Sequence, residues 1–562
     1  MAFRNDVIRL LKKDFDVDVD SLLEIPPSPE MGDLAFPCFA LSKVMKKAPP
    51  AIASELASKL KPEGIIAEIK ALGPYVNFYV DKAKLAAEIL PKIVSDADNY
   101  GHSTDMAENS LMIEYSSPNT NKAQHLGHVR NNLLGMALSN VLSAVGAKVI
   151  RCCLMNDRGL GVTQALLAYM KWGNGKEPDI KPDHFVADYY VMFHQKAKGD
   201  PKLEEEAKEL LSRWELGDEE VIKVWKKMSG WVYEGYDETY KSLGCEFDVT
   251  YYESEIYTLG REIIKRGLDD GKFVKKEGAV VADLSKFNLP DKVLLKSDGT
   301  SLYITQDIYL ANKKFEDYKI DASYYVVGSE QSLYFKQLFA VLQVLGFAWA
   351  KKCFHLSYGY VSLQSGRMKS REGTVVDADD VISDMKKLAR EEIKKRHDIP
   401  DEEVEKRASE IALGAIKFFF LKYDPNMDFV FNPKESIAFE GETGPYVQYA
   451  HARVCSILRK ANLEVETKAD FSRLSDGVEQ ELVVLLDRFP SVIKDAASHN
   501  KPSLVCRYLI DVSQKFSEFY HTCPCISEDE ELMKARVLLV LGVKQVLCNG
   551  LGILGIVAPS RM

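Results

Sequence analysis

The chain has 562 residues, 46% of them hydrophobic and 28% charged, which is the composition of a globular protein long enough for about three or four domains. A formal net charge of −10 and an isoelectric point near 5.7 count against a protein that coats nucleic acid through a uniformly basic surface. No apolar run approaches the length of a membrane span and charges appear already at Arg4 and Asp6, so we expect a cytoplasmic protein without membrane contacts.

The first 105 residues combine short helical patterns with one alternating strand. Residues 73–80 read GPYVNFYV, a turn signal followed by alternation of apolar and polar side chains. A polar stretch at residues 95–110 separates this region from the rest, and we expect an N-terminal α+β domain over residues 1–105. Asn77 and Tyr79 lie on the strand, where they either contact a partner or pack in the core.

Residues 111–155 follow the pattern strand, turn, helix, strand. The apolar run at 111–115 leads into SPNTNKAQHLGH at 117–128, apolar residues then recur every three or four positions from Leu126 to Val145, and a second apolar run covers 148–155. Such a unit places the helix N-terminus at the carboxyl edge of a parallel sheet, where free N–H groups attract phosphate. We expect a multidomain α/β protein with a Rossmann-like, nucleotide-binding domain over residues 106–385.

The turn at the mouth of this unit carries the chemistry of a phosphate site. His125 and His128 are three residues apart and can reach the same phosphate, Gly127 lets a nucleotide approach the backbone, and Lys122 adds a cation. A His-x-x-His pair also fits a metal site or two histidines that cap a helix. No third ligand is near, and the ten cysteines lack metal-ligand spacing, so we expect free thiols and no structural metal.

The remainder of this domain contains an insertion and a second candidate pocket. Residues 171–251 are helical and charged, which indicates an insertion between the two halves of the sheet. After an Asp-Gly turn at Asp298, a helix start places Tyr303 and Asp307 four residues apart on one face. We expect these two side chains to line a binding site; for Asp307 alone, an acidic charge favoured by the helix dipole is an equally good account.

A second phosphate-binding candidate lies downstream. Residues 366–376 read GRMKSREGTVV and follow the apolar run at 356–363. A cationic loop flanked by glycines suits nucleotidyl transfer, which depends on positioning and charge neutralisation. Taken alone, the segment also fits an ordinary solvated turn.

From residue 386 to residue 562 we expect a wholly helical domain. Apolar stripes at 402–421, 478–498, 504–520 and 529–551 predict long helices. Tyr446 and Tyr449 share a helix face, where they either stack on unpaired bases, at about 1–3 kcal/mol per base, or pack in the core. The terminal GLGILG fits no dinucleotide site, because no strand precedes it and the chain ends before another helix.

These segments together resemble the class I aminoacyl-tRNA synthetases. Residues 125–128 are similar to the HIGH motif, and residues 114–135, 303–307 and 436–453 resemble the arginyl-tRNA synthetases in particular. The loop resembles the KMSK element; with Met368 aligned, Arg367 replaces the first lysine and Ser370 the second. Arginyl-tRNA synthetases commonly lack that second lysine, and the resemblance implies that Lys122 replaces it.

The resemblance also implies which residues carry each role. The catalytic set is Lys122, His125, His128, Arg367 and Lys369. The ATP-binding set is His125, Gly127, His128, Met368 and Lys369. The arginine-binding set is Glu114, Asn119, Tyr303, Asp307 and Gln331. The tRNA-binding set is Asn77, Tyr446, Tyr449 and Met562.

The resemblance implies an arginine–tRNA ligase that activates arginine with ATP and transfers it to the 3′ end of tRNA(Arg). Mg²⁺ would accompany the ATP, and we expect a monomer. The N-terminal domain would bind the tRNA elbow, and the helical bundle at residues 386–562 would bind the anticodon. Two alternatives stay open: another class I synthetase, and a catalytically silent paralogue, which only Ser370 supports.

Overall fold

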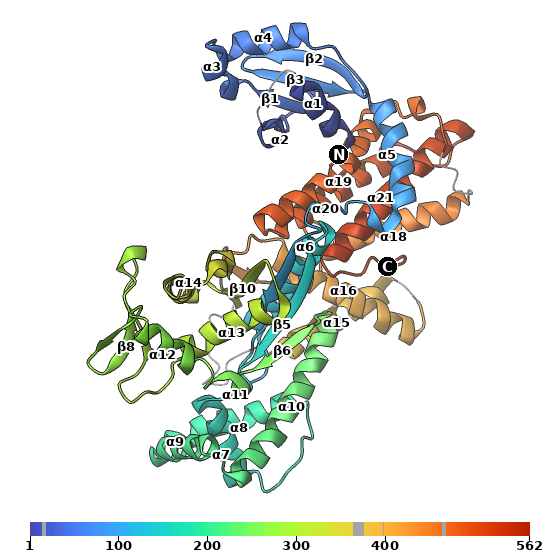
Figure 1. Cartoon of the computed structure of the whole chain (residues 1–562). Coiled ribbons are helices and arrows are strands. Elements are labelled where there is room, and N and C mark those ends of the chain that lie inside the picture. Colours follow the sequence, from blue (N-terminus) through green and yellow to red (C-terminus); the bar gives the residue numbers. More distant parts are fainter. Residues whose placement is uncertain (14–17, 364–375, 397, 463–467) are drawn as a thin grey trace.

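The computed structural model describes residues 1–13, 18–363, 376–396, 398–462 and 468–562. Figure 1 shows three parts: a small N-terminal unit, a central sheet with its insertions, and a bundle of long helices. The central sheet is parallel and the C-terminal part is mainly helical, so the predicted fold class is confirmed.

The N-terminal unit is an antiparallel sheet covered by helices. The strand expected at residues 73–80 is β3, which lies between the other two strands and follows a turn where Gly73 has a φ of +57°. The strands are β1 (Leu34–Pro37), β2 (Ile66–Leu72) and β3 (Tyr75–Val80). The helices are α1 (Ala2–Lys12), α2 (Val19–Leu22), α3 (Phe39–Met45) and α4 (Pro49–Lys59).

This unit is attached to the C-terminal bundle. The next helix, α5 (Lys82–Asp96), packs against bundle helices α19 (Gly477–His499) and α21 (Glu530–Ile553). The Asn549 side-chain amide donates to the carbonyls of Ala97 and Tyr100, both at 2.9 Å. Two parts that are far apart in sequence therefore share one packed interface.

The central sheet has five strands in the order β11-β10-β4-β5-β6, and every neighbouring pair is parallel. The strands are β4 (Ser110–Glu114), β5 (Lys148–Met155), β6 (Val249–Tyr252), β10 (Ala322–Gly328) and β11 (Cys353–Tyr358). The predicted helix is α6 (Leu126–Ala144), which is buried on almost every side. The strand order reverses between β4 and β10, and ligands bind outside the carboxyl ends of parallel strands at such a point.

Two insertions and two further helices complete the central part. The helical insertion follows α7 (Leu160–Trp172) and consists of α8 (Pro182–Ala197), α9 (Lys202–Glu215) and α10 (Glu219–Leu243). After α11 (Glu253–Ile256) and α12 (Arg261–Asp269), a second insertion, not predicted, forms an antiparallel sheet of β7 (Val274–Lys276), β8 (Ala279–Ala282) and β9 (Lys292–Leu295). The remaining helices are α13 (Tyr303–Tyr318) and α14 (Ser332–Val344).

The C-terminal part contains the four helices with predicted ranges, each within two residues of its predicted ends. They are α16 (Asp401–Leu421), α19, α20 (Ser503–Thr522) and α21. The helix expected to carry Tyr446 and Tyr449 is α18 (Gly444–Ala461). The expectation of a wholly helical region is wrong, because β13 (Phe429–Phe431) pairs in parallel with β12 (Val361–Leu363). Phe429 and Phe431 are buried while Val430 is 48% exposed, a strand alternation too short to detect among helices. Helices α15 (Ala378–Arg396) and α17 (Pro433–Ser436) flank this region.

Among the described residues, helix α21 is the one helix long and apolar enough to cross a membrane by length and composition alone. Because 67% of its most apolar window is buried inside the fold, α21 has the character of a core helix. The terminal glycines Gly550 and Gly552 lie within it, and all ten cysteines are free thiols as expected.

Arg130 joins the central sheet to the bundle. Its fully buried guanidinium donates to the carbonyls of Gly359 at 2.9 Å and Pro425 at 2.7 Å, and more weakly to those of Tyr360 and Asp424 at 3.4 Å. Burial lowers the pKa of Arg130 to about 10, which keeps the group charged at neutral pH. Helix α6 is thereby fixed to two loops that lie far from it in sequence.

Replacing Arg130 with leucine should destabilise the protein strongly. The change leaves buried carbonyls without donors, and each such group costs about 1–3 kcal/mol. Arg473→Leu is the matched control, because Arg473 is half exposed and its ion pairs with Asp470 and Asp529 span 3.7–3.8 Å, a kind worth about 0–1 kcal/mol. Thermal unfolding followed by circular dichroism should show a much larger drop in Tm for Arg130→Leu; equal drops would contradict this role.

Candidate active site

The two histidines of the first motif cap helix α6. The His125 Nδ1 atom accepts from the Gly127 N–H, and the His128 Nδ1 atom accepts from the His125 N–H, each at 3.1 Å. Their ring centroids are 4.0 Å apart. The capping arrangement considered from sequence is therefore present, and it uses only one nitrogen of each ring.

Burial sets the charge state of these rings. Desolvation, with a further contribution from the positive charge of Lys122, lowers the pKa of His125 to about 4 and that of His128 well below its ordinary value. A neutral ring whose Nδ1 accepts a hydrogen bond carries its proton on Nε2. Both histidines can thus donate an N–H to an anionic oxygen without themselves being charged.

The turn before α6 is held by its neighbours. The Tyr236 hydroxyl on α10 lies 2.9 Å from the Asn119 carbonyl and 2.6 Å from the Lys122 carbonyl and donates to them. The Thr120 N–H donates to the Asn156 carbonyl at 3.1 Å, and the Asn156 N–H donates back to Pro118 at 3.0 Å. The side chain of Asn119 remains exposed.

Two of the expected arginine-binding residues, Glu114 and Asp307, lie close together near the reversal of strand order. Glu114 ends β4 and forms an ion pair with Lys314, which is fully buried. The Asp307 carboxylate accepts from the Tyr334 hydroxyl, and burial raises the pKa of Asp307 to about 7, with Glu114 adding to the rise. Tyr303 lies one turn before Asp307 on α13 and is 69% exposed.

Gln331 is exposed and lies between the end of β10 and the first residue of α14. The expected helix start at Tyr303 is confirmed, but α13 also brings in Lys314, which sequence reasoning missed. Lys314 is two turns beyond Asp307 on the same helix, and this spacing was its only signal. Glu253, 2% exposed at the start of α11, was also missed; burial raises its pKa to about 7.

Residues Arg367, Met368 and Lys369 of the second motif lie outside the described residues. The segment that follows them is described and lies against the first motif. Asp377 pairs with His125 in an antiparallel bridge, and the Ala378 N–H donates to the Gln124 carbonyl at 2.8 Å. Residues about 250 positions apart in sequence therefore meet at the N-terminus of α6.

The expected tRNA contacts have different surroundings. Tyr449 and Met562 line a cavity of about 660 Å³ between α18, α20 and the chain end. The charged residues lining it are all basic: Arg407, Arg453, Arg459, Lys460 and Arg561. The Arg453 guanidinium lies 4.8 Å from the Tyr449 ring centroid. Tyr446 is half-buried and outside this lining, and Asn77 is only 3% exposed.

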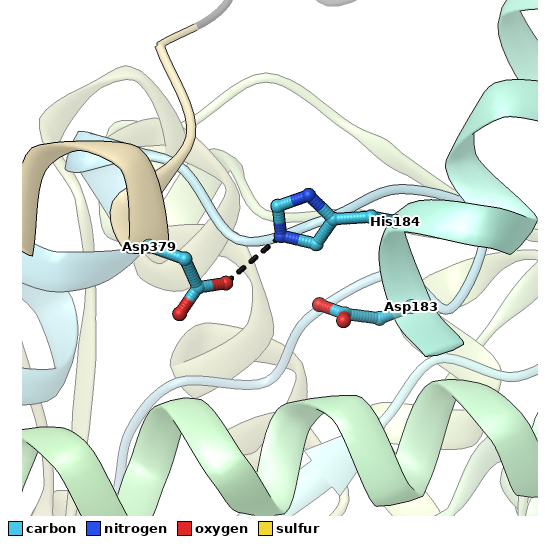
Figure 2. Close-up of side chains that lie close together, drawn as sticks. All are labelled: Asp183, His184 and Asp379. Carbon is cyan, nitrogen blue, oxygen red and sulfur yellow. Dashed lines mark hydrogen bonds and ion pairs between the residues drawn. The ribbon is translucent and has the colours of Figure 1, made fainter. Parts of the chain in front are cut away.

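One cluster among the described residues has the composition of a metal site. Asp183, His184 and Asp379 bring their ligand atoms within 4.8 Å of one another, and Figure 2 shows His184 bonded to Asp379. The Lys181 ammonium already fills the cation position, at 3.0 Å from Asp183, 2.9 Å from Asp379 and 2.7 Å from the Thr239 hydroxyl. The contacts with Asp379 and Thr239 are hydrogen bonds and the contact with Asp183 is an ion pair, so a cation of the protein itself already pairs with both carboxylates.

Histidine-selective ¹⁵N NMR should show that the pKa of His125 lies below the ordinary imidazole value and that the pKa of His184 lies above it. Imidazole ordinarily titrates near 6.5; His125 should stay neutral to about pH 4 with its proton on Nε2, because burial disfavours the charged ring. His184 should instead stay protonated above the ordinary value, because its hydrogen bond to Asp379 raises its pKa. Titration of both rings at the same pH would contradict this description of the site.

The chain matches three family models that together cover most of its length. They are described as "tRNA synthetases class I (R), catalytic domain" at residues 89–433, "DALR anticodon binding domain" at 447–562 and "Arginyl tRNA synthetase N terminal domain" at 2–80.

Curated relatives and solved structures agree with these matches. An arginine–tRNA ligase of Treponema denticola is 44% identical over 550 residues, covering 94% of this chain and 93% of the relative. One from Bacteroides thetaiotaomicron is 42% identical, covering 94% of each chain. The solved arginyl-tRNA synthetase of Thermus thermophilus superposes with a TM-score of 0.86 at 28% identity, covering 100% of this chain and 99% of that chain. The chain belongs to the arginyl-tRNA synthetase family of class I aminoacyl-tRNA synthetases.

Proposed function

We propose that the residues around α6 and α13 carry out the two steps of an arginine–tRNA ligase. The chain is an ATP-dependent ligase that activates arginine and transfers it to the 3′ end of tRNA(Arg). The observation that carries the residue assignment is that two neutral histidine donors and a carboxylate pocket flank the same end of β4.

In the first step an arginine carboxylate oxygen attacks the α-phosphorus of ATP in line, and pyrophosphate leaves with the bonding electrons. His125 and His128 donate through Nε2 to the phosphate oxygens, where preorganised donors stabilise charge that grows in the transition state. Lys122 adds a positive charge for the departing pyrophosphate, with Gly127 leaving room for the nucleotide. Mg²⁺ enters bound to the ATP phosphates as part of the substrate. Arg367, Met368 and Lys369 contribute from the second motif.

Charge balance supports the arginine pocket. Glu114 and ionised Asp307 carry two negative charges and Lys314 carries one positive charge, so the pocket has a net charge that one guanidinium neutralises. Tyr303 supplies an aromatic wall at its exposed side. Asn119 and Gln331 hold the α-amino group of the substrate.

Transfer requires tRNA to span the three parts. The basic cavity with Tyr449 and Met562 is suited to unpaired anticodon bases, because aromatic stacking and cations both favour nucleic acid. Tyr446 and Asn77 are the remaining proposed contacts, and Asn77 requires local movement since it is buried. We further propose a cytoplasmic monomer without membrane contacts.

Arginine-dependent ATP–pyrophosphate exchange tests this function directly, measured with and without total tRNA and with other amino acids as controls. Exchange that depends on arginine identifies the substrate. Exchange driven by another amino acid would favour a different class I synthetase, and no exchange under any condition would favour the silent paralogue.

Asp307→Asn should weaken arginine binding and remove its pH dependence. Loss of a charged hydrogen bond costs about 1.5–3 kcal/mol, or roughly 10- to 100-fold in Kd. Because the pKa of Asp307 is raised to about 7, the wild-type Kd for arginine should rise as the pH falls below that value and the carboxylate protonates. Asp317→Asn is the control, an exposed carboxylate on the same helix paired with Lys313. Isothermal titration calorimetry measures the Kd for arginine in each variant. An unchanged Kd in Asp307→Asn would show that Asp307 does not bind the substrate and only stabilises the helix.

Lys122→Ala should slow adenylate formation by about 10² to 10³, the loss expected for one preorganised transition-state donor, with little change in substrate binding. Adding Ser370→Lys in that background should restore part of the rate. Single-turnover measurement of adenylate formation gives the result. A wild-type rate, or a defect confined to tRNA binding, would show that Lys122 does not compensate for the missing lysine.

A further inference from the structure

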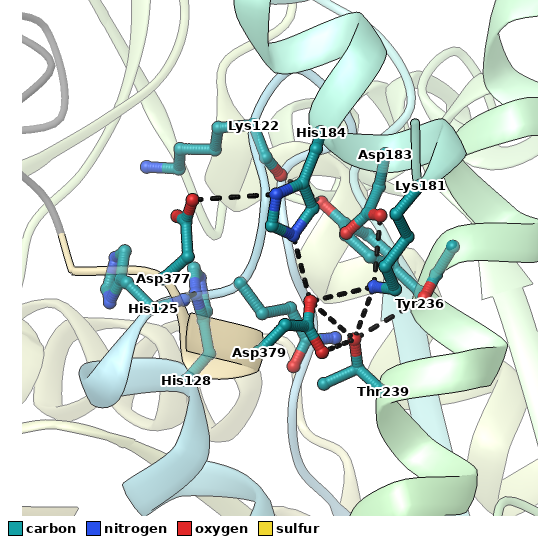
Figure 3. A network of polar contacts seen from close by, with 12 residues as sticks. Lys122, His125, His128, Lys181, Asp183, His184, Tyr236, Thr239, Asp377 and Asp379 are labelled. Atoms are coloured by element: carbon teal, nitrogen blue, oxygen red, sulfur yellow. Dashed lines mark hydrogen bonds and ion pairs between the residues drawn. The ribbon is translucent and has the colours of Figure 1, made fainter. Parts of the chain in front are cut away.

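The helical insertion contacts both halves of the ATP site. On one side, Tyr236 of α10 donates to the carbonyls of Asn119 and Lys122 in the turn before α6. On the other side, residues of α8 and α10 bind the first residues of α15, which follow the second motif in sequence. Figure 3 shows both sets of contacts around the two histidines.

The second set converges on Asp379. Its Oδ2 atom accepts from the Lys181 ammonium and from His184 Nε2, both at 2.9 Å, and its Oδ1 atom accepts from the Thr239 hydroxyl at 3.1 Å. The other ring nitrogen of His184 lies 3.6 Å from an Asp377 carboxylate oxygen. A single imidazole therefore bridges two carboxylates at the start of α15.

The backbone of the same segment contacts the catalytic motif. Asp377 is bridged to His125, and the Ala378 N–H donates to the Gln124 carbonyl at 2.8 Å. The side chains of Asp377 and Asp379 thus face the insertion, while the backbone between them pairs with the residues that cap α6. Any displacement of this segment would move the His125 cap.

Close packing supports the arrangement. Asp183 is fully buried between α8 and α10, and a Cβ added at Gly235 would lie 2.2 Å from its Oδ1 atom. The two insertion helices can approach this closely only because residue 235 is glycine. The Lys181 ammonium lies 3.0 Å from Asp183 as well as 2.9 Å from Asp379, which links the buried core of the insertion to α15.

We propose that the insertion is a positioning device for adenylate formation, in which His184, Lys181 and Thr239 hold residues 377–379 against the first histidine motif. The proposal rests on the roles proposed above for His125 and His128. These three are positioning residues, because they act on the reaction through the segment that pairs with His125.

Protonation of His184 strengthens the arrangement. The charged groups around the ring are Asp183 and Asp188 on α8, Asp377 just before α15 and Asp379 on α15. The Lys181 ammonium pairs with two of these carboxylates, Asp183 and Asp379. The hydrogen bond to Asp379 raises the pKa of His184. A protonated ring has two N–H donors and can bridge both carboxylates, whereas a neutral ring has only one. Burial raises the pKa of Asp377 to about 6. The bridge is therefore complete between that pH and the raised pKa of His184, and it loses one contact as the pH rises through the latter.

The first experiment measures kcat and KM for arginine-dependent pyrophosphate exchange with saturating tRNA. His184→Gln and Asp379→Asn should each lower kcat by about 10- to 100-fold, the cost of a small misplacement of reacting groups, and leave KM for arginine unchanged. The losses in the double variant should be less than multiplicative, because the two changes share the His184–Asp379 contact, although each also breaks contacts of its own. Asp188→Asn is the matched control: it removes a charge facing His184 but no contact to α15, and kcat should stay within about twofold of wild type.

A pH series separates positioning from general destabilisation. His184→Lys keeps a positive charge at all working pH values, so it should retain most of the activity. The ratio of wild-type to His184→Lys kcat should fall as the pH rises from about 6 to 9, across and above the ordinary imidazole range. If His184→Gln fails to fold, this ratio still decides the question.

The outcomes distinguish this proposal from the function on which it rests. Wild-type kcat in His184→Gln, full multiplicative losses in the double variant, or a flat pH ratio would overturn the positioning role. If His125→Ala also leaves kcat unchanged, the proposed catalytic histidines are wrong. If wild-type exchange does not depend on arginine, the proposed function itself fails.

Discussion

The buried guanidinium of Arg130 is the interaction on which the arrangement of the whole chain depends. It sits on the helix whose N-terminus carries His125 and His128 and donates to carbonyls at residues 359 and 425. The adjacent Asp424 side chain accepts from Lys501 at 2.6 Å and Ser503 at 2.7 Å, at the start of α20. The helix of the proposed ATP site and α20, which lines the basic cavity through Tyr520, are therefore linked by one set of hydrogen bonds.

Burial produces opposite electrostatic results on the two sides of β4. At the N-terminus of α6, desolvation keeps His125 and His128 neutral, so that they can donate to an anion without repelling one another. At the proposed arginine pocket, burial raises the pKa of Asp307, and a guanidinium bound there would supply the charge that favours ionisation. Under the proposed roles, the same desolvation gives a neutral donor site for the nucleotide and a substrate-dependent anionic site for the amino acid.

The elements that sequence could predict are those defined by local periodicity. The apolar spacing from Leu126 to Val145 located α6, and the long stripes near the end of the chain located the bundle helices within two residues. Contacts between distant segments had no local signal: the Glu114–Lys314 pair, the bridge of Asp377 to His125, and the three-residue strand β13 all depend on partners far away in sequence. The sequence allows the two histidines to cap the helix. Which ring nitrogen carries the proton follows only from the hydrogen bonds that each Nδ1 atom accepts in the structure.

The docking of α5 on the bundle has a consequence for biosynthesis. The apolar face of α5, including Leu85, Ile89 and Ile93, is covered by helices from the last part of the chain, and Tyr100 is bonded to Asn549, 449 residues later. At translation rates of about 5–20 residues per second, that separation corresponds to roughly 20–90 s before the last partner of α5 has been made. During this time α1 is available to α5 but α21 is not. The nascent N-terminal unit therefore carries an incompletely covered apolar helix, a state suited to capture by a holding chaperone, until the helices of the bundle emerge.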